Sequence, residues 1–322
     1  MTRRSLLLLI SILCVEPCFC WGFFAHRQIN YLAVFLLPPE MIGFYKKNQQ
    51  FLADHAVDPD KRRYAISEEA SRHFIDLDRY GRYPFDSLPH HWDEAVKRYS
   101  QDSLLRHGIV PWWIQIMLSR LTKAFREKDA ARILKLSADM GHYISDAHVP
   151  LHASSNHNGQ HTGQHGIHGF WESRIPESFA AASFDFVIGK AVYIDKPLSY
   201  TWDRVLESAA SSDTVLRVEK HLSEVFPSDM RYAFEDRNGL IVRQYSSHYT
   251  GEYHLKLNGM VERRMRQSIF SVSSFWYTAW VNAGQPDLRQ FGTVAFDSAD
   301  RAEWDSLNRH WRAAKIRGRD CE

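Results

Sequence analysis

The stretch DAARILKLSADMGHYISDA, residues 129–147, combines a strong helical pattern with two candidate metal-binding side chains. Apolar residues recur at three- and four-residue intervals through Ile133 and Met140, as expected for an amphipathic helix. A second row at four-residue spacing ends in His142 and Asp146, so the helix is apolar on two sides and should be buried. Because residues four apart lie about one turn of ~5.4 Å apart on the same face, both side chains can reach one cation.

Histidines are concentrated immediately after this helix, where residues 141–172 hold seven of the 17 in the chain. Pro150 ends the helix, and His152 follows it. His168 and Glu172 then repeat the four-residue spacing. Neutral imidazole and carboxylate are preferred zinc ligands. One such pair alone is more often a polar pair on a helix surface, but together these residues predict two neighbouring metal ions with Asp146 between them.

Four further histidines in this region have no fixed periodicity and lie among glycine and asparagine residues. We expect them to be solvated loop residues outside the site, with adventitious metal binding as the alternative. They are His148, His157, His161 and His165.

Helical spacing of apolar residues recurs along much of the chain, and alternating patterns typical of strands are scarce. We therefore predict an all-α fold, a single-domain multi-helix bundle, over residues 21–284. The longest predicted helix covers residues 257–283 and ends before Gly284 and Pro286. A charged tail is expected over residues 285–322. Further helices are predicted from His26 to the Pro38 and Pro39 pair and over 111–126, 198–209 and 213–225, with loops over 54–63, 80–90 and 153–167.

The N-terminal segment predicts export. Residues 1–20 combine a basic start with an apolar run from Leu6 to Val15, the pattern of a secretory signal peptide. The run is too short to span a bilayer, so we expect a soluble periplasmic or secreted protein. Small residues at Cys18 and Cys20 favour cleavage after Cys20. A lipoprotein anchor ranks second, because the residues before the cysteines are not small.

Charge and cysteine content narrow the function classes. The chain has 40 basic and 38 acidic residues, a net charge of +2, and removal of residues 1–20 would leave +1. This balance gives no support for tight duplex binding through phosphate neutralisation. Cys321 would be the remaining cysteine, so no internal disulfide is expected. Stability should then come from an apolar core or from bound metals.

Further candidate ligands lie upstream of the helix. His26 follows the predicted new N-terminus closely, and His73 is preceded by Asp54, Asp58 and Asp60. Taken alone, these residues have ordinary explanations, because a surface charge cluster accounts for the aspartates and His26 could pack within its own helix.

Taken together, these residues resemble the motifs of the superfamily that joins bacterial zinc-dependent phospholipase C with the fungal-type single-strand-specific nucleases. The resemblance extends from Trp21 to about Ala283 and implies an all-helical fold with about three zinc ions. Its most specific element is His142-x3-Asp146-x3-Pro150-Leu151-His152, followed by His168-x3-Glu172.

The resemblance also implies which residues bind metal. Asp58 is preferred to Asp54 and Asp60, because its spacing to His73 resembles the nuclease pattern and because Arg62 follows it as a candidate phosphate contact. The other two aspartates remain open. The implied sites are a first from Asp58, His73, His142 and Asp146, a second from His152, His168 and Glu172, and a third from His26, Asp146 and the free amine and carbonyl of Trp21.

Such a site predicts hydrolysis of phosphodiester bonds. Clustered zinc ions lower the pKa of bound water to about 7 and clamp the oxygens of a phosphoryl group. Asp58 would also orient or deprotonate the attacking water, and Arg62 would hold a phosphate oxygen. The His73-Phe74-x-Asp76 pattern is similar to both branches, so Phe74 and Asp76 are candidate substrate contacts, with ordinary core packing as the alternative for Phe74.

The substrate class is predicted less directly. Glu172 and the lack of disulfides resemble the phospholipase branch, which favours release of a phospholipid headgroup. The short spacings from Trp21 to His26 and from Asp58 to His73 resemble the nuclease branch, so a single-strand-preferring nuclease is the alternative. A non-catalytic cell-envelope protein with structural zinc is a more distant alternative. No protein partner is predicted.

Overall fold

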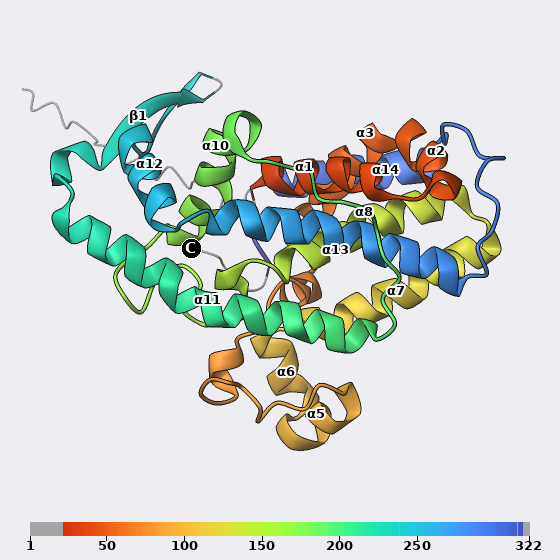
Figure 1. The fold of residues 1–322 in the computed structure, drawn as a ribbon, viewed down its shortest axis with the longest axis horizontal. Coiled ribbons are helices and arrows are strands. Elements are labelled where there is room, and N and C mark those ends of the chain that lie inside the picture. The colour runs from red at the N-terminus through yellow and green to blue at the C-terminus, as the bar shows by residue number, and fades with distance from the viewer. Residues whose placement is uncertain (1–21, 238, 314, 318–322) are drawn as a thin grey trace, which may run out of the picture.

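The computed structural model describes residues 22–237, 239–313 and 315–317 (Figure 1). Within these ranges helices dominate, and a two-stranded antiparallel sheet is the one sheet present. The prediction of a mainly helical protein is therefore confirmed. Across the same ranges, every helix is too short or too polar to span a bilayer.

One helix, α8, runs through the centre of the bundle. Asp129 caps its first turn by accepting a hydrogen bond from the Arg132 backbone N–H at 3.0 Å. Ile133 and Met140 are fully buried, as the apolar pattern predicts. The neighbouring helices α1, α7 and α13 pack against it on different sides. The bounds of these four helices are Phe23–Ala33 for α1, Val110–Glu127 for α7, Ala130–Asp146 for α8 and Met260–Asn282 for α13.

Shorter helical segments surround this centre. Several are single turns of three to six residues. The segments are η1 (Val34–Leu36), α2 (Pro39–Lys47), α3 (Gln49–Asp54), η2 (His55–Val57), α4 (Asp58–Arg62), η3 (Ser67–Arg72), η4 (Leu77–Arg79), α5 (Trp92–Tyr99), α6 (Gln101–His107), η5 (Pro150–Ala153), α9 (Ile167–Gly169), η6 (Phe170–Arg174), α10 (Ile175–Ser183), η7 (Ser228–Met230) and α12 (Ser247–Lys256).

Two predicted helices form one continuous helix, α11 (Pro197–Val225), which lies along the lower edge of the bundle in Figure 1. The two predictions, over residues 198–209 and 213–225, left a gap that contains Ser211 and Ser212. Ser211 Oγ donates to Glu207 O and Ser212 Oγ donates to Ala209 O, each at 2.8 Å. Because these hydroxyls bond to carbonyls of the same helix, both serines are compatible with helical backbone.

The predicted charged tail over residues 285–322 contains a helix that the sequence analysis did not predict, α14 (Ser298–Arg312). Asp297 and Asp300 form a capping box at its start. Lys135 of α8 donates to Asp300 at 2.8 Å, and the Trp304 ring lies 5.6 Å from the Phe51 ring. The helix packs against α4. The prediction of a loop over residues 54–63 is wrong, because this segment holds short helices.

A small hairpin was missed by the sequence analysis. Strands β1 (Tyr232–Arg237) and β2 (Leu240–Tyr245) pair antiparallel, with Tyr232 opposite Tyr245. The hairpin projects at the end of the molecule where α12 lies (Figure 1). Arg174 anchors it by donating to Glu235 Oε2 at 3.0 Å.

Gly141 is required by the close approach of α1 to α8. Asn30 of α1 donates to Ala138 O at 3.1 Å, and a Cβ added at Gly141 would overlap Asn30 Oδ1. We expect Gly141→Ala to lower the free energy of unfolding by about 1–3 kcal/mol, although alanine favours helices. Denaturant titration of metal-free protein measures this. The control is Gly43→Ala, whose Cβ would meet nothing within 4 Å; equal stability of both variants would contradict the prediction.

Candidate metal centre

Among the residues that the structure describes, buried histidines and carboxylates form three groups that could each hold a metal ion. In each group, one ligand atom per residue lies within 4.8 Å of the others. The eight residues, termed the cluster, come from α1, α4, α8 and the segments around η3 and η5 to η6. The groups are His26, His142 and Asp146; Asp60, His73 and His142; and His152, His168 and Glu172.

Asp146, at the last position of α8, lies at the middle of the cluster. Its Oδ2 is 2.9 Å from His73 Nδ1 and 3.2 Å from His142 Nε2. Its Oδ1 is 3.5 Å from His26 Nε2 and 3.8 Å from His152 Nδ1. Burial opposes ionisation, but attraction from His142 and His152 outweighs it and holds the pKa of Asp146 well below its usual value. The two oxygens face different histidines, as the predicted bridging position requires.

His142 and His26 lie against each other, with ring centroids 3.9 Å apart. His142 Nδ1 lies 2.9 Å from Ala56 O, a carbonyl that can only accept, so Nε2 faces the cluster. Burial disfavours its charged form, but the carboxylates of Asp146 and Asp60 outweigh this and raise the pKa of His142 to about 9. Burial, together with His142, lowers the pKa of His26 well below its usual value.

Asp60 is the aspartate of α4 that belongs to the cluster. It is 5% exposed, and its Oδ1 lies 3.6 Å from His142 Nε2 and 3.9 Å from His73 Nδ1. Arg63 Nη1 lies 3.9 Å from the same oxygen. Burial raises the pKa of Asp60, against the attraction of His142 and His73. Of the three aspartates that the sequence left open, the structure brings Asp60 to the histidines.

The structure therefore corrects the preference for Asp58 that was based on the sequence. Its Oδ2 lies 2.6 Å from His55 Nδ1, and its Oδ1 accepts from Lys61 Nζ at 3.1 Å. Burial opposes the shift, but the hydrogen bonds and charges of His55 and Lys61 together outweigh it and lower the pKa of Asp58. Residues two apart on a helix point about 200° away from each other, so Asp58 and Asp60 cannot serve the same site. Asp54 lies on α3 with its side chain 45% exposed.

The third group brings together His152, His168 and Glu172, the residues of the second site inferred from the sequence. His168 Nε2 lies 3.0 Å from Glu172 Oε2, and His152 Nε2 lies 3.6 Å from the same oxygen. His152 Nδ1 lies 2.6 Å from the backbone carbonyl of His73, which fixes its other nitrogen toward Glu172. Glu172 lies in a π-helical turn, η6, a form that is frequent at functional sites.

The histidine-rich stretch over residues 153–167 lacks regular structure but is held in place by side-chain hydrogen bonds. Asn158 Oδ1 accepts from the backbone N–H groups of Gly166 and His168, at 3.0 and 3.3 Å. Ser155 Oγ donates to Asp78 Oδ2 at 2.6 Å. These contacts fix the start of α9, and hence the position of His168.

Two of the four histidines expected in solvent are buried instead. His161 and His165 are exposed, as predicted. His148 is buried, with Nδ1 2.8 Å from Ile144 O and Nε2 3.1 Å from Ser271 Oγ. His157 is buried beside His168, with ring centroids 6.0 Å apart. These two positions depend on packing by α13 and α9, which no local pattern predicts.

Arg62 does not present a free guanidinium fork to a phosphate. Its Nη2 donates to Asp139 Oδ2 at 2.9 Å, and its Nη1 donates to Tyr143 Oη at 3.2 Å and lies 3.4 Å from Glu69 Oε1. Glu69 is completely buried and was not singled out from the sequence. Its spacing of four residues before His73 was the available signal.

Phe74 and Asp76, the predicted substrate contacts, are buried at 8% and 5% exposure. The Phe74 carbonyl accepts from the Val110 backbone N–H at 3.2 Å, and a Cβ at Gly108 would overlap it. Asp76 Oδ2 lies 3.7 Å from His107 Nδ1. In this structure Phe74 contacts the start of α7, and Asp76 contacts the end of α6. Contact of either residue with a substrate stays a prediction.

Trp21, the predicted third-site ligand, lies outside the described residues. Its neighbour Gly22 donates from its backbone N–H to Ser173 Oγ at 3.2 Å. Ser173 directly follows Glu172, and a Cβ added at Gly22 would lie 2.5 Å from the hydroxyl oxygen. Gly22, which directly precedes α1, therefore lies against the π-helical turn that carries Glu172.

The chemistry of the cluster fits bound cations. Several of its polar atoms are buried and have no hydrogen-bond partner within the described residues, a costly state unless another ligand satisfies them. Imidazole nitrogens and carboxylate oxygens on converging side chains are a donor set that suits zinc. The atoms include both nitrogens of His26, both carboxylate oxygens of Asp60, Asp146 Oδ1 and His152 Nε2.

Comparison with known proteins does not assign the chain. No protein-family model matches it, and no curated protein shows significant sequence similarity to it.

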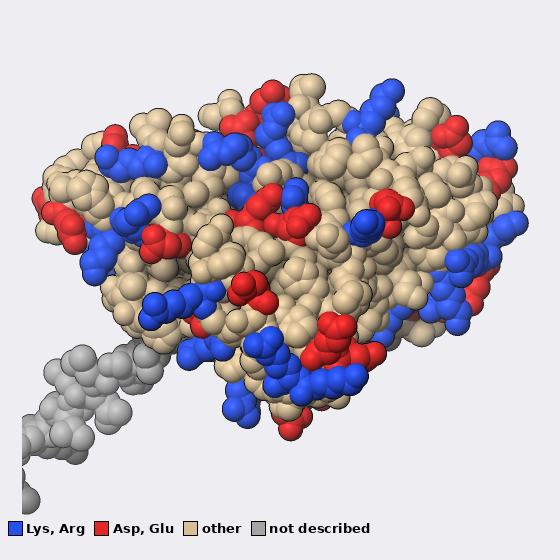
Figure 2. Space-filling view, turned by 60° about the horizontal axis from the view of Figure 1, so that its bottom comes forward, with Lys and Arg blue, Asp and Glu red and all other residues tan. Residues whose placement is uncertain are grey.

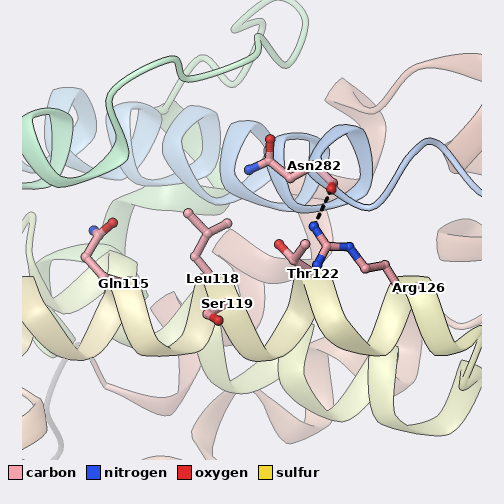
Figure 3. Close-up of a pocket in the computed structure, with 6 residues that line it drawn as sticks. All are labelled: Gln115, Leu118, Ser119, Thr122, Arg126 and Asn282. Carbon is pink, nitrogen blue, oxygen red and sulfur yellow. Dashed lines mark hydrogen bonds between the residues drawn. The ribbon is translucent and has the colours of Figure 1, made fainter.

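A separate pocket lies between α7 and α13 (Figure 3). Arg126 spans it by donating to Asn282 O at 2.9 Å. None of the six residues that line this pocket belongs to the cluster, so it does not open onto the candidate metal centre. They are Gln115, Leu118, Ser119, Thr122, Arg126 and Asn282.

Proposed function

We propose that this protein is an exported zinc-dependent hydrolase of phosphodiester bonds, with the helical fold of the phospholipase C and single-strand nuclease superfamily. One observation carries the proposal. Buried histidine and carboxylate ligands form three adjoining groups, two of which share His142, and Asp146 lies within 4 Å of a histidine from each. Several of their polar atoms have no other partner among the described residues. Such an arrangement suits adjacent cations better than an isolated structural site, which closes four ligands around one ion.

The proposed ligands are the cluster residues, with about three zinc ions as the resemblance implies. Bound zinc would supply a hydroxide-forming water and neutralise charge on a phosphoryl group. Asp146 would bridge two ions through its two oxygens. Asp60, in place of Asp58, would hold one ion and orient the attacking water through its second oxygen. Trp21 would complete the third site once the signal peptide is removed.

A phospholipid is the proposed substrate, with release of the phosphorylated headgroup. A nuclease that binds single strands usually combines a basic groove with stacking aromatic residues. Here Arg62 and Arg72, two cations near His73, are both paired with Glu69. Figure 2 shows Lys and Arg interspersed with Asp and Glu on the face it presents, without a continuous basic track. The near-neutral net charge of +2 supports the same choice.

The test compares substrates on exported, untagged protein loaded with zinc. We expect release of phosphorylated headgroup from phosphatidylcholine vesicles and little cleavage of single-stranded DNA or RNA at the same pH and zinc concentration. Chelation should abolish activity, and elemental analysis should find about three zinc ions per chain. N-terminal sequencing of the same sample should begin at Trp21.

Each alternative has its own outcome. Rapid nucleic-acid cleavage without lipid turnover would reject the phospholipid and favour the nuclease branch. Full zinc occupancy without activity on lipid, nucleic acid or a small phosphodiester would favour structural zinc. Absence of zinc from the untagged protein would contradict the metal centre itself.

A further inference from the structure

Glu69 lies beside the cluster in a buried network of charged groups. Its side chain is completely buried, and its Oε2 accepts a short hydrogen bond from Arg72. Its Oε1 accepts a short hydrogen bond from the Tyr143 hydroxyl and lies 3.4 Å from Arg62 Nη1. A buried carboxylate is costly unless it is paired. Two arginines and a hydroxyl therefore hold Glu69 in one position.

The network reaches the cluster through His73. The Nδ1 atom of His73 faces the cluster, 2.9 Å from Asp146 Oδ2 and 3.0 Å from His142 Nε2. Its Nε2 points the other way and lies 3.6 Å from Glu69 Oε1. This nitrogen has no closer hydrogen-bond partner in the described part of the chain. Closing the gap by roughly 0.6 Å would give an ordinary N–H···O hydrogen bond.

We propose that Glu69 is a positioning residue, which orients the His73 imidazole toward its metal ion by accepting a hydrogen bond from Nε2. The inference rests on the proposed metal centre but on no particular substrate. A carboxylate on the outer nitrogen of a ligating histidine fixes its tautomer and makes it a stronger metal ligand.

His73 differs in this respect from two other histidines of the cluster. His142 Nδ1 lies 2.9 Å from the carbonyl of Ala56, and His152 Nδ1 lies 2.6 Å from the carbonyl of His73 itself. Backbone carbonyls are neutral acceptors, whereas Glu69 brings a charge.

The network also gives Arg62 a role in place of the phosphate contact predicted from the sequence. Arg62 joins Glu69 to Asp139, which lies on α8 one turn before Tyr143. Arg72 stacks over the Trp113 ring of α7, with its guanidinium carbon 4.1 Å from the ring centroid. Glu69 is thus linked to the central helices α7 and α8. The packing of these two helices therefore holds it in position.

The experiment measures metal binding by competition with a chelator in Glu69→Gln, Glu69→Asp and the control Glu68→Gln. Glu68 is the exposed neighbour in the same turn. We expect Glu69→Gln to weaken the binding of one metal ion about 10–100-fold, as loss of such a partner typically does. Glu69→Asp should recover part of the loss, and Glu68→Gln should match the original protein. The visible spectrum of cobalt-substituted protein should change most in Glu69→Gln, less in Glu69→Asp and not in Glu68→Gln.

The result is separable from the proposed function, because it is read from metal affinity and the cobalt spectrum. A shifted affinity in a protein that hydrolyses no substrate would support the role of Glu69 and reject the hydrolase. Unchanged affinity for every ion in folded Glu69→Gln would overturn the inference. If both Glu69 variants lost all metals and also lost the native circular dichroism spectrum, the inference would be overturned too. Glu69 would then serve the fold as a whole.

Discussion

Substitution of Asp146 by Asn is expected to cause the largest loss of metal and activity of any single change in this protein. Asp146 Oδ2 faces His73 and His142, and its Oδ1 faces His26. An amide offers one carbonyl oxygen and one NH2 group, so it cannot present two acceptor oxygens to two ions. We expect kcat/KM to fall by more than the ~100-fold typical of losing a residue that only orients a ligand.

Zinc content and hydrolysis of the best substrate measure this effect. Asp195→Asn is the matched control, because Asp195 is exposed and outside the cluster. Circular dichroism should show that both variants keep their helices. Equal zinc content and equal activity in the two variants would refute a bridging role for Asp146.

The second large effect separates the two aspartates of α4. Asp60→Asn should remove the binding of about one metal ion, since a neutral amide is a poor zinc ligand. Asp58→Asn should retain full metal content, because Asp58 is paired with His55 and Lys61. Its expected cost is in the free energy of unfolding, about 1–3 kcal/mol for weakening hydrogen bonds between charged groups.

Elemental analysis and denaturant titration of both variants decide between the two positions. A loss of metal in Asp58→Asn with normal metal in Asp60→Asn would restore the assignment made from sequence and contradict the side-chain orientations of α4. Substitution of the exposed Asp54 should change neither measurement by much, which makes Asp54→Asn a suitable third variant.

Local periodicity explains what could be predicted from the chain alone. The spacing of apolar residues over 129–147 was sufficient to predict α8. The same 3.6-residue repeat predicted that His142 lies beside Asp146. His168 and Glu172 were predicted as a pair for the same reason, and they lie 3.0 Å apart. Each of these contacts spans one helical turn, so it does not depend on how distant segments pack.

Packing between distant segments decided the remainder. Choosing Asp60 over Asp58 required the orientation of α4, a five-residue helix held against α14. No local pattern predicts this packing. Recognising Glu69 required knowing that η3 buries it against Arg62 and Tyr143 of other segments. Sequence by itself determined the helical class and the pairs within single turns, because backbone geometry alone sets those distances. Tertiary structure decided which carboxylates are buried and lie beside the histidines, because burial and charge pairing depend on groups far apart in the chain.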